Sequence, residues 1–179
     1  MKKEIKVWDY AGRIMEAIDE GILLTTAAQG EKDTMVIGWG HIGVIWGKPV
    51  FVAYVRESRH TKSLVDKNGE FTVNTPLAPI DKNIIAVCGT KSGRDMDKFA
   101  ELGLETEEGL TVSVPGIRQL PLTLECKVRC SSVQNIPMLP EDIQKRYYPQ
   151  GVDSSNPGSN GDFHVAYYGE IVNAYLITD

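Results

Sequence analysis

The stretch Tyr54-Val55-Arg56-Glu57-Ser58-Arg59-His60-Thr61 joins a run typical of a buried strand, 49–53, to a segment typical of one or two helical turns, 61–67. Two arginines and two hydroxyls at a strand-to-helix junction suit an anion, because guanidinium groups offer forked donors to phosphate and helix amides add partial positive charge. A solvated strand end with a helix cap from Ser58 or Thr61 explains the same residues equally well. The stretch alone leaves both interpretations open.

A second basic segment, Ser92-Gly93-Arg94-Asp95, precedes a predicted helix over 95–102 that carries Lys98 one turn in. Glycine lets backbone approach a ligand closely, and Arg94 and Lys98 add positive charge. The alternative is a capped helix start with a surface pair between Asp95 and Lys98. Two such segments in a chain of net charge −5 favour anion binding.

Length and composition fit one soluble globular domain over residues 1–179, with 42% hydrophobic and 24% charged residues. The acidic net charge argues against nucleic acid as a partner. The N-terminus does not resemble a signal peptide, and no stretch approaches a membrane span. We therefore expect a cytoplasmic protein with no membrane partner.

Closely spaced strand-like runs with turn signals between them predict an antiparallel sheet, because the spacing leaves no room for crossover helices. The predicted fold is mainly β (α+β): an antiparallel barrel with helices in the connections. Helices are predicted over 8–19, 61–67, 81–88, 95–102 and 140–148. Strands are predicted over 22–28, 34–40, 42–46, 49–55, 70–74, 122–133 and 164–177, with a polar turn at 29–33, a bulge at 169–170 and a loop at 151–161.

The remaining chemistry-bearing residues show no self-sufficient catalytic motif. The glycines of 34–40 could bare backbone groups for a flat heterocycle, although a core strand with a bulge explains this segment more simply. Cys126 and Cys130 are too far apart along one strand for an unstrained disulfide, and with Cys88 they are predicted to lie in the core. The histidines lack metal-ligand spacing, and no nucleophile elbow, P-loop or dinucleotide fingerprint is present. An enzyme of this sequence would need a cofactor to carry the reaction.

Four motifs occur in the order seen in the flavin reductase-like family: Ile37-Gly38-Trp39, Tyr54-Val55-Arg56-Glu57-Ser58-Arg59-His60-Thr61, Phe71-Thr72-Val73-Asn74 and Cys88-Gly89-Thr90-Lys91-Ser92-Gly93-Arg94-Asp95-Met96-Asp97-Lys98-Phe99. The chain resembles that family, and its flavoredoxin-type members most, from about residue 20 to 168–171. The last motif is the most specific. One departure is Glu57, where the family often has proline, so Glu57 must point outward if the resemblance holds at this site.

The resemblance implies an FMN-binding split barrel, usually a homodimer with two flavins near the subunit interface. Arg56, Ser58, Arg59 and Thr61 would hold the phosphate and ribityl end of FMN, and the segment 92–98 would close the same region. Backbone of 35–39, with Asn74, would line the isoalloxazine ring. The full set of implied cofactor-binding residues is Met35, Ile37, Gly38, Trp39, Tyr54, Arg56, Ser58, Arg59, Thr61, Asn74, Thr90, Ser92, Gly93, Arg94 and Lys98.

The activity that the resemblance implies is an NAD(P)H-dependent flavin reductase, in which the flavin accepts a hydride and no residue needs to act as acid or base. His164 is the candidate for the nicotinamide or substrate side, and a surface histidine is an equal alternative. A second possibility is an FMN electron carrier that is reduced by another protein. A third is a barrel for another anionic ligand, or a structural dimer.

Overall fold

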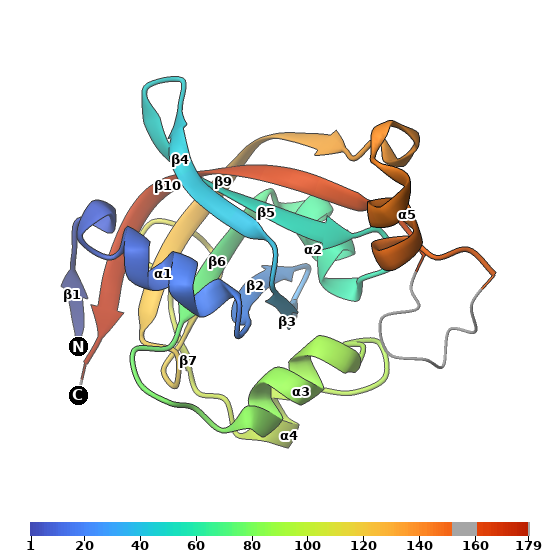
Figure 1. Cartoon of the computed structure of the whole chain (residues 1–179). Coiled ribbons are helices and arrows are strands. Elements are labelled where there is room, and N and C mark those ends of the chain that lie inside the picture. Colours follow the sequence, from blue (N-terminus) through green and yellow to red (C-terminus); the bar gives the residue numbers. More distant parts are fainter. Residues whose placement is uncertain (152–160, 179) are drawn as a thin grey trace.

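The computed structural model describes residues 1–151 and 161–178, and these residues form a curled antiparallel sheet of eight strands (Figure 1). Its order is β3-β2-β6-β9-β10-β5-β4, with β1 paired to β10. The end strands β3 and β4 do not pair with each other in the described residues, so the barrel is split. The strands are β1 (Lys2–Glu4), β2 (Ile22–Ala28), β3 (Glu31–Ile37), β4 (Gly40–Ile45), β5 (Lys48–Arg56), β6 (Glu70–Thr75), β9 (Leu122–Val133) and β10 (His164–Ile177).

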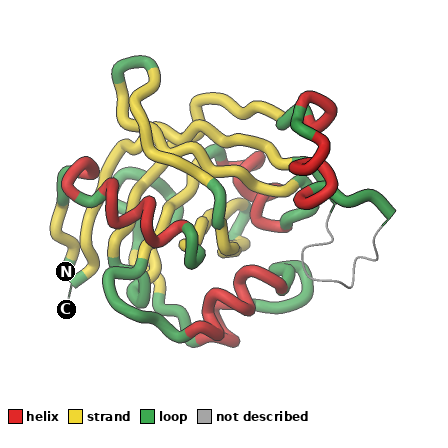
Figure 2. Tube along the Cα trace, viewed as in Figure 1, coloured by secondary structure: helices red, strands yellow, loops and turns green. Residues whose placement is uncertain are grey.

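Helices lie at the ends and edges of this sheet, in its connections (Figure 2), which confirms the predicted antiparallel α+β fold. They are α1 (Ala11–Ile18), α2 (His60–Asn68), α3 (Lys82–Thr90), α4 (Lys98–Leu102) and α5 (Glu141–Tyr147), with short 3-10 turns η1 (Val7–Asp9) and η2 (Ile136–Met138). A separate hairpin pairs β7 (Thr106–Glu107) with β8 (Gly116–Ile117).

The main core lies between the sheet and α1. Ile14 and Ile18 recur at helical spacing, so both face the sheet, where they pack with side chains such as Ile22, Phe51 and Phe71. A second core on the other face of β2 packs Leu23 against α3, α4 and the β8 region. The two cores hold the strand ends and loops that carry the basic segments in fixed positions.

Three predicted strands, 22–28, 122–133 and 164–177, match the structure residue for residue. The predicted bulge is also present, because the register of β10 against β9 shifts between Tyr168 and Gly169. A Cβ at Gly169 would lie 2.5 Å from the Phe71 ring, so the bulge brings the backbone against the core where a side chain would not fit.

The predicted polar turn at 29–33 is wrong in its second half. Gln29 and Gly30 alone make the turn, with φ of 55° and 82°, which is the left-handed conformation that a tight two-residue hairpin requires. The chain therefore re-enters the sheet at Glu31, and Asp33 pairs with Thr26 inside β3. This places a carboxylate in the sheet where the sequence suggested a solvated loop.

The predicted helix over 95–102 is too long at its start. The Asp97 side chain accepts hydrogen bonds from the amides of Phe99 (2.9 Å) and Ala100 (3.2 Å), so it caps the helix and α4 begins only at Lys98. The amides of Phe99 and Ala100 are thus already satisfied by Asp97.

The alternation of apolar and polar residues over 122–133 predicts a half-buried strand, and the burial of β9 differs from that pattern in detail. Thr123 and Glu125, predicted to face solvent, are fully buried, because the Glu125 carboxylate accepts hydrogen bonds from the amides of Leu110 (2.5 Å) and Thr111 (2.8 Å) and holds that loop over the strand. At the other end of β9, Cys130 is exposed, although Cys88 and Cys126 are buried as predicted.

No helix among residues 1–151 and 161–178 has the length and apolar character that crossing a membrane requires. The predicted loop at 151–161 lies almost wholly outside the described residues.

Candidate functional site

Two adjoining pockets share Met35 and Arg59 and contain every predicted site residue except Asn74. The first, which we call the polar pocket, has a volume of about 160 Å³ and is lined by Asp33, Met35, Ser58, Arg59, His60, Thr61, Thr90, Lys91, Ser92, Gly93, Arg94 and Lys98. The second, the aromatic pocket, has about 180 Å³ and is lined by Met35, Val36, Ile37, Gly38, Trp39, Tyr54, Arg56, Arg59 and His164.

The polar pocket is built where the turn from β5 into α2 meets the loop between α3 and α4. A hydrogen bond of 3.2 Å from Nη1 of Arg94 to the carbonyl oxygen of Ser58 ties the two segments together. Within the second segment, the Ser92 hydroxyl accepts a bond of 3.2 Å from the Arg94 amide and so shapes the turn. The two basic motifs that the sequence singled out are therefore neighbours in space.

Asp33 supplies a buried carboxylate to this pocket, which the sequence analysis missed. Its Oδ1 lies 2.9 Å from Nζ of Lys98, and its Oδ2 accepts a 2.6 Å hydrogen bond from the Thr61 hydroxyl. The alternative role of Thr61 as a helix cap is absent, since Arg59 stands at the cap position of α2 and no side chain caps it. The Gln29-Gly30 dipeptide was the signal that could have placed Asp33 in a strand, because such a pair fits a two-residue hairpin.

Arg59 lies between the two pockets and is half-buried. Its Nη2 donates a 2.7 Å hydrogen bond to the carbonyl oxygen of Gly89. Burial first, and then the charge of Arg56, lower the pKa of Arg59, while Asp162 and Asp33 act in the opposite direction. A partly desolvated guanidinium beside a second cation gains from a nearby anion.

Arg56 lines the aromatic pocket and not the polar one, and its predicted role in phosphate binding stays a prediction. Its Nη1 and Nη2 donate to the carbonyl oxygens of Asp162 (2.7 Å) and Tyr147 (2.9 Å). The guanidinium also lies over the Tyr148 ring, 5.4 Å from its centroid. Arg56 thus fastens the end of α5 and the start of β10 to the sheet.

Glu57 points away from both pockets, as the phosphate-site prediction required. Its side chain is 45% exposed and pairs with Nζ of Lys62 at 3.2 Å. The carboxylate near the Ser58 amide is instead that of Asp162, whose Oδ2 accepts from it at 2.7 Å. One negative group therefore does approach this edge of the site, although it is paired with Arg56 at 3.5 Å.

Asn74 is the predicted site residue that the structure does not bring to either pocket. It is fully buried in β6, where its Nδ2 donates to the Thr25 hydroxyl (3.0 Å) and its Oδ1 accepts from the Ile117 amide (3.0 Å). Its amide group is engaged in joining β6 to β2 and β8. The structure thus gives Asn74 a place in the core, and its predicted role at a ring site stays a prediction.

In the aromatic pocket the Trp39 ring packs on His164, with centroids 4.5 Å apart and planes at 32°, and meets the edge of Tyr147 at 5.1 Å. His164 is 6% exposed, so it is not a surface histidine, and its Nδ1 lies 2.9 Å from the Tyr148 hydroxyl. Burial, and then the charge of Arg56, lower the pKa of His164 to about 4. The imidazole is therefore neutral at neutral pH.

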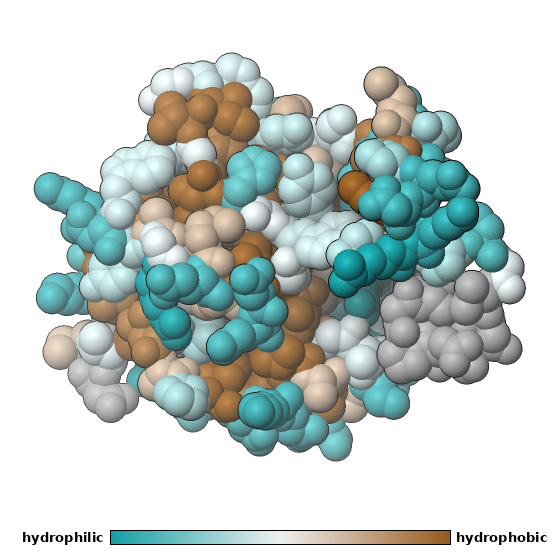
Figure 3. Space-filling model, viewed as in Figure 1, coloured by the Kyte–Doolittle hydropathy of each residue, from teal (hydrophilic) through white to brown (hydrophobic). Residues whose placement is uncertain are grey.

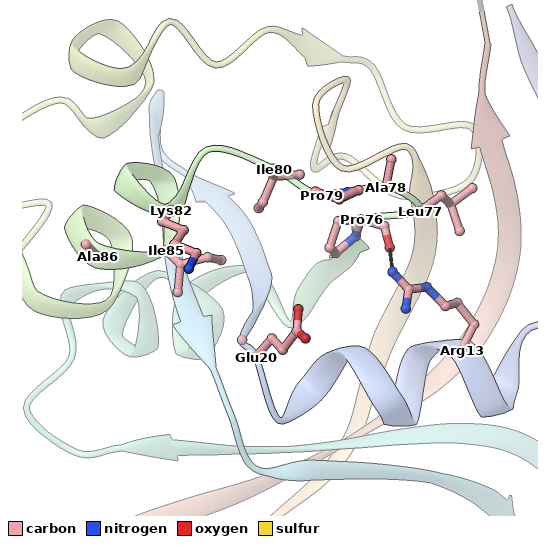
Figure 4. A pocket seen from close by; sticks show the side chains of 11 residues that line it. Arg13, Glu20, Pro76, Leu77, Ala78, Pro79, Ile80, Lys82, Ile85 and Ala86 are labelled. Carbon is pink, nitrogen blue, oxygen red and sulfur yellow. Dashed lines mark hydrogen bonds between the residues drawn. The ribbon is translucent and has the colours of Figure 1, made fainter.

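A larger groove of about 930 Å³ lies between α1 and α3, away from these residues (Figure 4). Its walls are mostly aliphatic and proline side chains of 76–86, and hydrophobic surface gathers in this part of the molecule (Figure 3). Arg13 on its rim already donates a 3.0 Å bond to the carbonyl oxygen of Pro76. The groove exceeds the two pockets in size, but the donor set that an anion needs lies in the polar pocket.

Among the described residues, no group of three or more histidine, cysteine, aspartate or glutamate side chains is placed to hold a metal ion. The arrangement offers instead an anion site with two arginines and several hydroxyls, next to a pocket walled by aromatic rings and bare backbone. A ligand with an anionic end and a flat ring suits this pair of pockets.

Comparisons with known proteins concern the chain as a whole. A family model described as "Flavin reductase like domain" matches residues 15–179. A solved FMN-binding domain of a flavin reductases-like enzyme from Shewanella baltica superposes with a TM-score of 0.63 at 15% identity, covering 98% of this chain and 77% of the other. A flavoredoxin from Methanosarcina acetivorans gives a TM-score of 0.63 at 25% identity, covering 88% of this chain and 68% of the other.

One curated relative, an uncharacterized protein of Archaeoglobus fulgidus, is 36% identical over 74 residues. The aligned stretch covers 41% of this chain and 41% of that relative, which is less than half the length of each.

Proposed function

Because the chain belongs to the flavin reductase-like domain family, we propose that it is an FMN-binding flavoprotein that acts as an NAD(P)H-dependent flavin reductase. In this proposal the polar pocket holds the phosphate of FMN, and the aromatic pocket lies beside the isoalloxazine ring. The observation that carries it is the convergence of two basic segments, far apart in sequence, on one pocket that adjoins a ring-walled one.

The donor set of the polar pocket fits a phosphate monoester. Such a dianion needs about two cations and several further donors. Arg59 and Arg94 supply the cations, and the hydroxyls of Ser58 and Ser92 lie among the lining groups. His60, another lining residue, has a buried Nδ1 that lacks a hydrogen-bond partner among the described residues. A polar atom of this kind is expected to gain a partner when the pocket is filled.

Pocket size supports a ligand that spans both sites. Neither pocket reaches about 300 Å³, the lower end for ligand cavities, whereas one ligand across both would use their joint volume. Arg59, which lines both, would lie at the middle of such a ligand.

The flavin, when bound, supplies the hydride and electron chemistry. The chain's residues bind and orient it. Trp39 offers an aromatic face, 36% exposed, beside the bare backbone at Gly38. His164, held neutral, adds no charge next to the ring, and the lowered pKa makes it a poor proton donor at neutral pH. Its predicted place on the nicotinamide or substrate side stays a prediction.

A second candidate, favoured by the likeness to a flavoredoxin, is an FMN electron carrier that is reduced by a partner protein instead of by nicotinamide. Rapid mixing of the FMN-loaded protein with NADH and NADPH separates the two. Fast bleaching of the flavin absorbance supports the reductase. Bleaching only on addition of a reduced redox protein supports the carrier.

We further propose a homodimer with the flavin near the interface. The tip of the β4–β5 hairpin projects from the sheet (Figure 1) and exposes Val44 (64%) and Trp46 (59%), an apolar surface that a second copy could cover. Light scattering on the wild type and on Val44→Ser/Trp46→Ser tests this: the mass should halve in the variant. A monomeric wild type would contradict the proposal.

The absorption spectrum of the purified protein tests the proposed function most simply. We expect flavin bands in the protein peak, or a raised melting temperature when FMN is added to flavin-free protein. A colourless protein whose melting temperature FMN leaves unchanged would sink the flavin proposal.

A further inference from the structure

We propose that Asp33 is a positioning residue of the flavin-phosphate site. Its buried carboxylate pairs with Lys98 and accepts a hydrogen bond from Thr61. Because these two side chains are engaged by Asp33, Arg59 and Arg94 are the residues that bind the phosphate. The inference rests on the proposed function and deepens it. It removes Lys98 and Thr61 from the predicted phosphate ligands and gives them a different task.

The first support is the burial of the ion pair. The side chains of Asp33 and Lys98 are 3% and 2% exposed, and their charged atoms are 2.9 Å apart. Nζ of Lys98 also donates a 2.5 Å bond to the carbonyl oxygen of Thr34, which fixes the ammonium on the strand. A buried charge is tolerated only when it is paired and hydrogen-bonded, so each member of this pair needs the other.

The second support is the packing around the carboxylate. The Thr61 hydroxyl donates to Oδ2 at 2.6 Å from the first turn of α2. From the other side, a Cβ added at Gly93 would lie 2.5 Å from Oδ1 of Asp33, so the backbone of the second basic segment rests directly on this carboxylate. Asp33 is thus the group on which α2, the 92–94 turn and the start of α4 converge.

The third support is the charge balance of the polar pocket. An unpaired carboxylate among the lining groups would repel a phosphate, and Lys98 cancels that charge. The Lys98 ammonium is therefore committed to Asp33. Arg59 and Arg94, by contrast, donate to the neutral carbonyl oxygens of Gly89 and Ser58, so their charges remain uncancelled by these bonds.

The inference implies that the polar pocket distinguishes flavins with a terminal phosphate from flavins without one. FMN and riboflavin share the same ring and ribityl chain and differ only in the phosphate, so the ratio of their affinities isolates the polar pocket. Changes at residues that meet the phosphate directly, or that alter the net charge beside it, shift this ratio. A change that only loosens the fold weakens both flavins alike.

The test measures the dissociation constants of FMN and riboflavin, together with the melting temperature, for four proteins: wild type, Lys98→Met, Asp33→Asn and the double variant. Lys98→Met leaves a bare carboxylate, so we expect the preference for FMN to fall by about tenfold or more and the melting temperature to drop by roughly 10 °C. Asp33→Asn should also lower the melting temperature, yet leave the preference for FMN equal or higher. The double variant should restore the preference to within about threefold of wild type.

If the double variant keeps the reduced FMN preference of Lys98→Met, Lys98 binds the phosphate itself and the inference is overturned. Thr61→Val, which keeps shape and charge, provides a second arm if the charge variants do not fold. It should leave the FMN preference within about threefold, and a tenfold loss would make Thr61 a phosphate ligand and overturn the inference.

A matched control is the pair of Lys62 and Asp66 on α2, which are 12% and 47% exposed, 2.8 Å apart and outside both pockets. Lys62→Met/Asp66→Asn should leave the FMN preference unchanged. A wild type that binds neither flavin overturns the proposed function and the inference with it. A wild type that prefers FMN, combined with an unrescued double variant, overturns only the role of Asp33.

Discussion

The polar pocket and the aromatic pocket adjoin each other but treat buried charge in opposite ways. In the polar pocket Asp33 and Lys98 form a buried ion pair at 2.9 Å, while the aromatic pocket keeps His164 neutral by lowering its pKa to about 4. Arg59 lines both. Under the proposed function, this difference separates two tasks: the polar pocket holds an anion and the aromatic pocket stacks an uncharged ring.

The largest predicted effect is a loss of folding stability in acid, caused by His164, which is neutral in the fold. Its pKa falls from 6.5 in the unfolded chain to about 4 in the fold, so the unfolded chain binds more protons between these values and stability falls as pH drops from about 6.5 to 4. The difference corresponds to about 3 kcal/mol of unfolding free energy. Urea unfolding across pH 4–7 should show this loss in the wild type and a flatter profile in His164→Asn. Parallel profiles would show that His164 is not held neutral.

Arg59→Ala should have the largest effect on binding, because Arg59 borders both pockets. Removal of a partly buried, charge-assisted contact should weaken FMN by about 2–3 kcal/mol, or roughly a hundredfold. Riboflavin should weaken less, because it lacks the phosphate. Calorimetric titration measures both, with Arg59→Lys as the control that keeps the charge. Unchanged FMN affinity would place the phosphate elsewhere.

Arg94→Ala tests the polar pocket, because it removes a cation that is proposed to bind the phosphate. Arg94 is exposed and meets the first basic segment at the Ser58 carbonyl, so its loss should weaken FMN by about tenfold and riboflavin hardly at all. The effect on FMN should also shrink at high salt, because exposed charges are screened. Equal weakening of both flavins would mean that Arg94 acts on the fold and not on the phosphate.

Trp39→Ala tests the aromatic pocket and has the smallest expected effect on flavin binding. Loss of an aromatic contact is worth about 0.5–1.5 kcal/mol, so FMN and riboflavin should weaken together, by about threefold to tenfold. Flavin fluorescence titration measures this. Lys82→Gln on the rim of the larger groove is the control and should change neither affinity. A loss confined to FMN in Trp39→Ala would contradict the assignment of the two pockets.

The polar pocket could be predicted from sequence because its donors lie in two short, continuous segments. Ser58, Arg59, Ser92 and Arg94 are identifiable by residue type and by their place at strand and helix boundaries, and the structure brings them together. The carboxylate between them was missed, since Asp33 enters a strand only because the chain turns within Gln29 and Gly30.

The aromatic pocket was harder to predict because its parts come from distant elements. His164 begins β10 and meets Trp39 only through the pairing of β10 with β5. Arg56 was predicted at the phosphate from its place beside Ser58 and Arg59, but its guanidinium donates to the carbonyl oxygens of Tyr147 and Asp162 from distant parts of the chain. Asn74 has an amide side chain that could hydrogen-bond a ring, but it lies in the core. There its amide group bonds to Thr25 of β2 and Ile117 of β8.

The same limit applies to the fold. Local patterns placed β2, β9 and β10 correctly, because in each strand a regular pattern of apolar residues extends over the whole segment. The burial of Glu125 depends on a loop that folds back over β9, and no periodicity within the strand predicts such cover.

The central claim is that the polar pocket binds the phosphate of FMN. Calorimetric titration of the flavin-free wild type with FMN and with riboflavin tests it most directly. We expect FMN to bind at least tenfold more tightly, because a dianion would meet Arg59 and Arg94. Equal affinities, or no binding of either flavin, would contradict the claim.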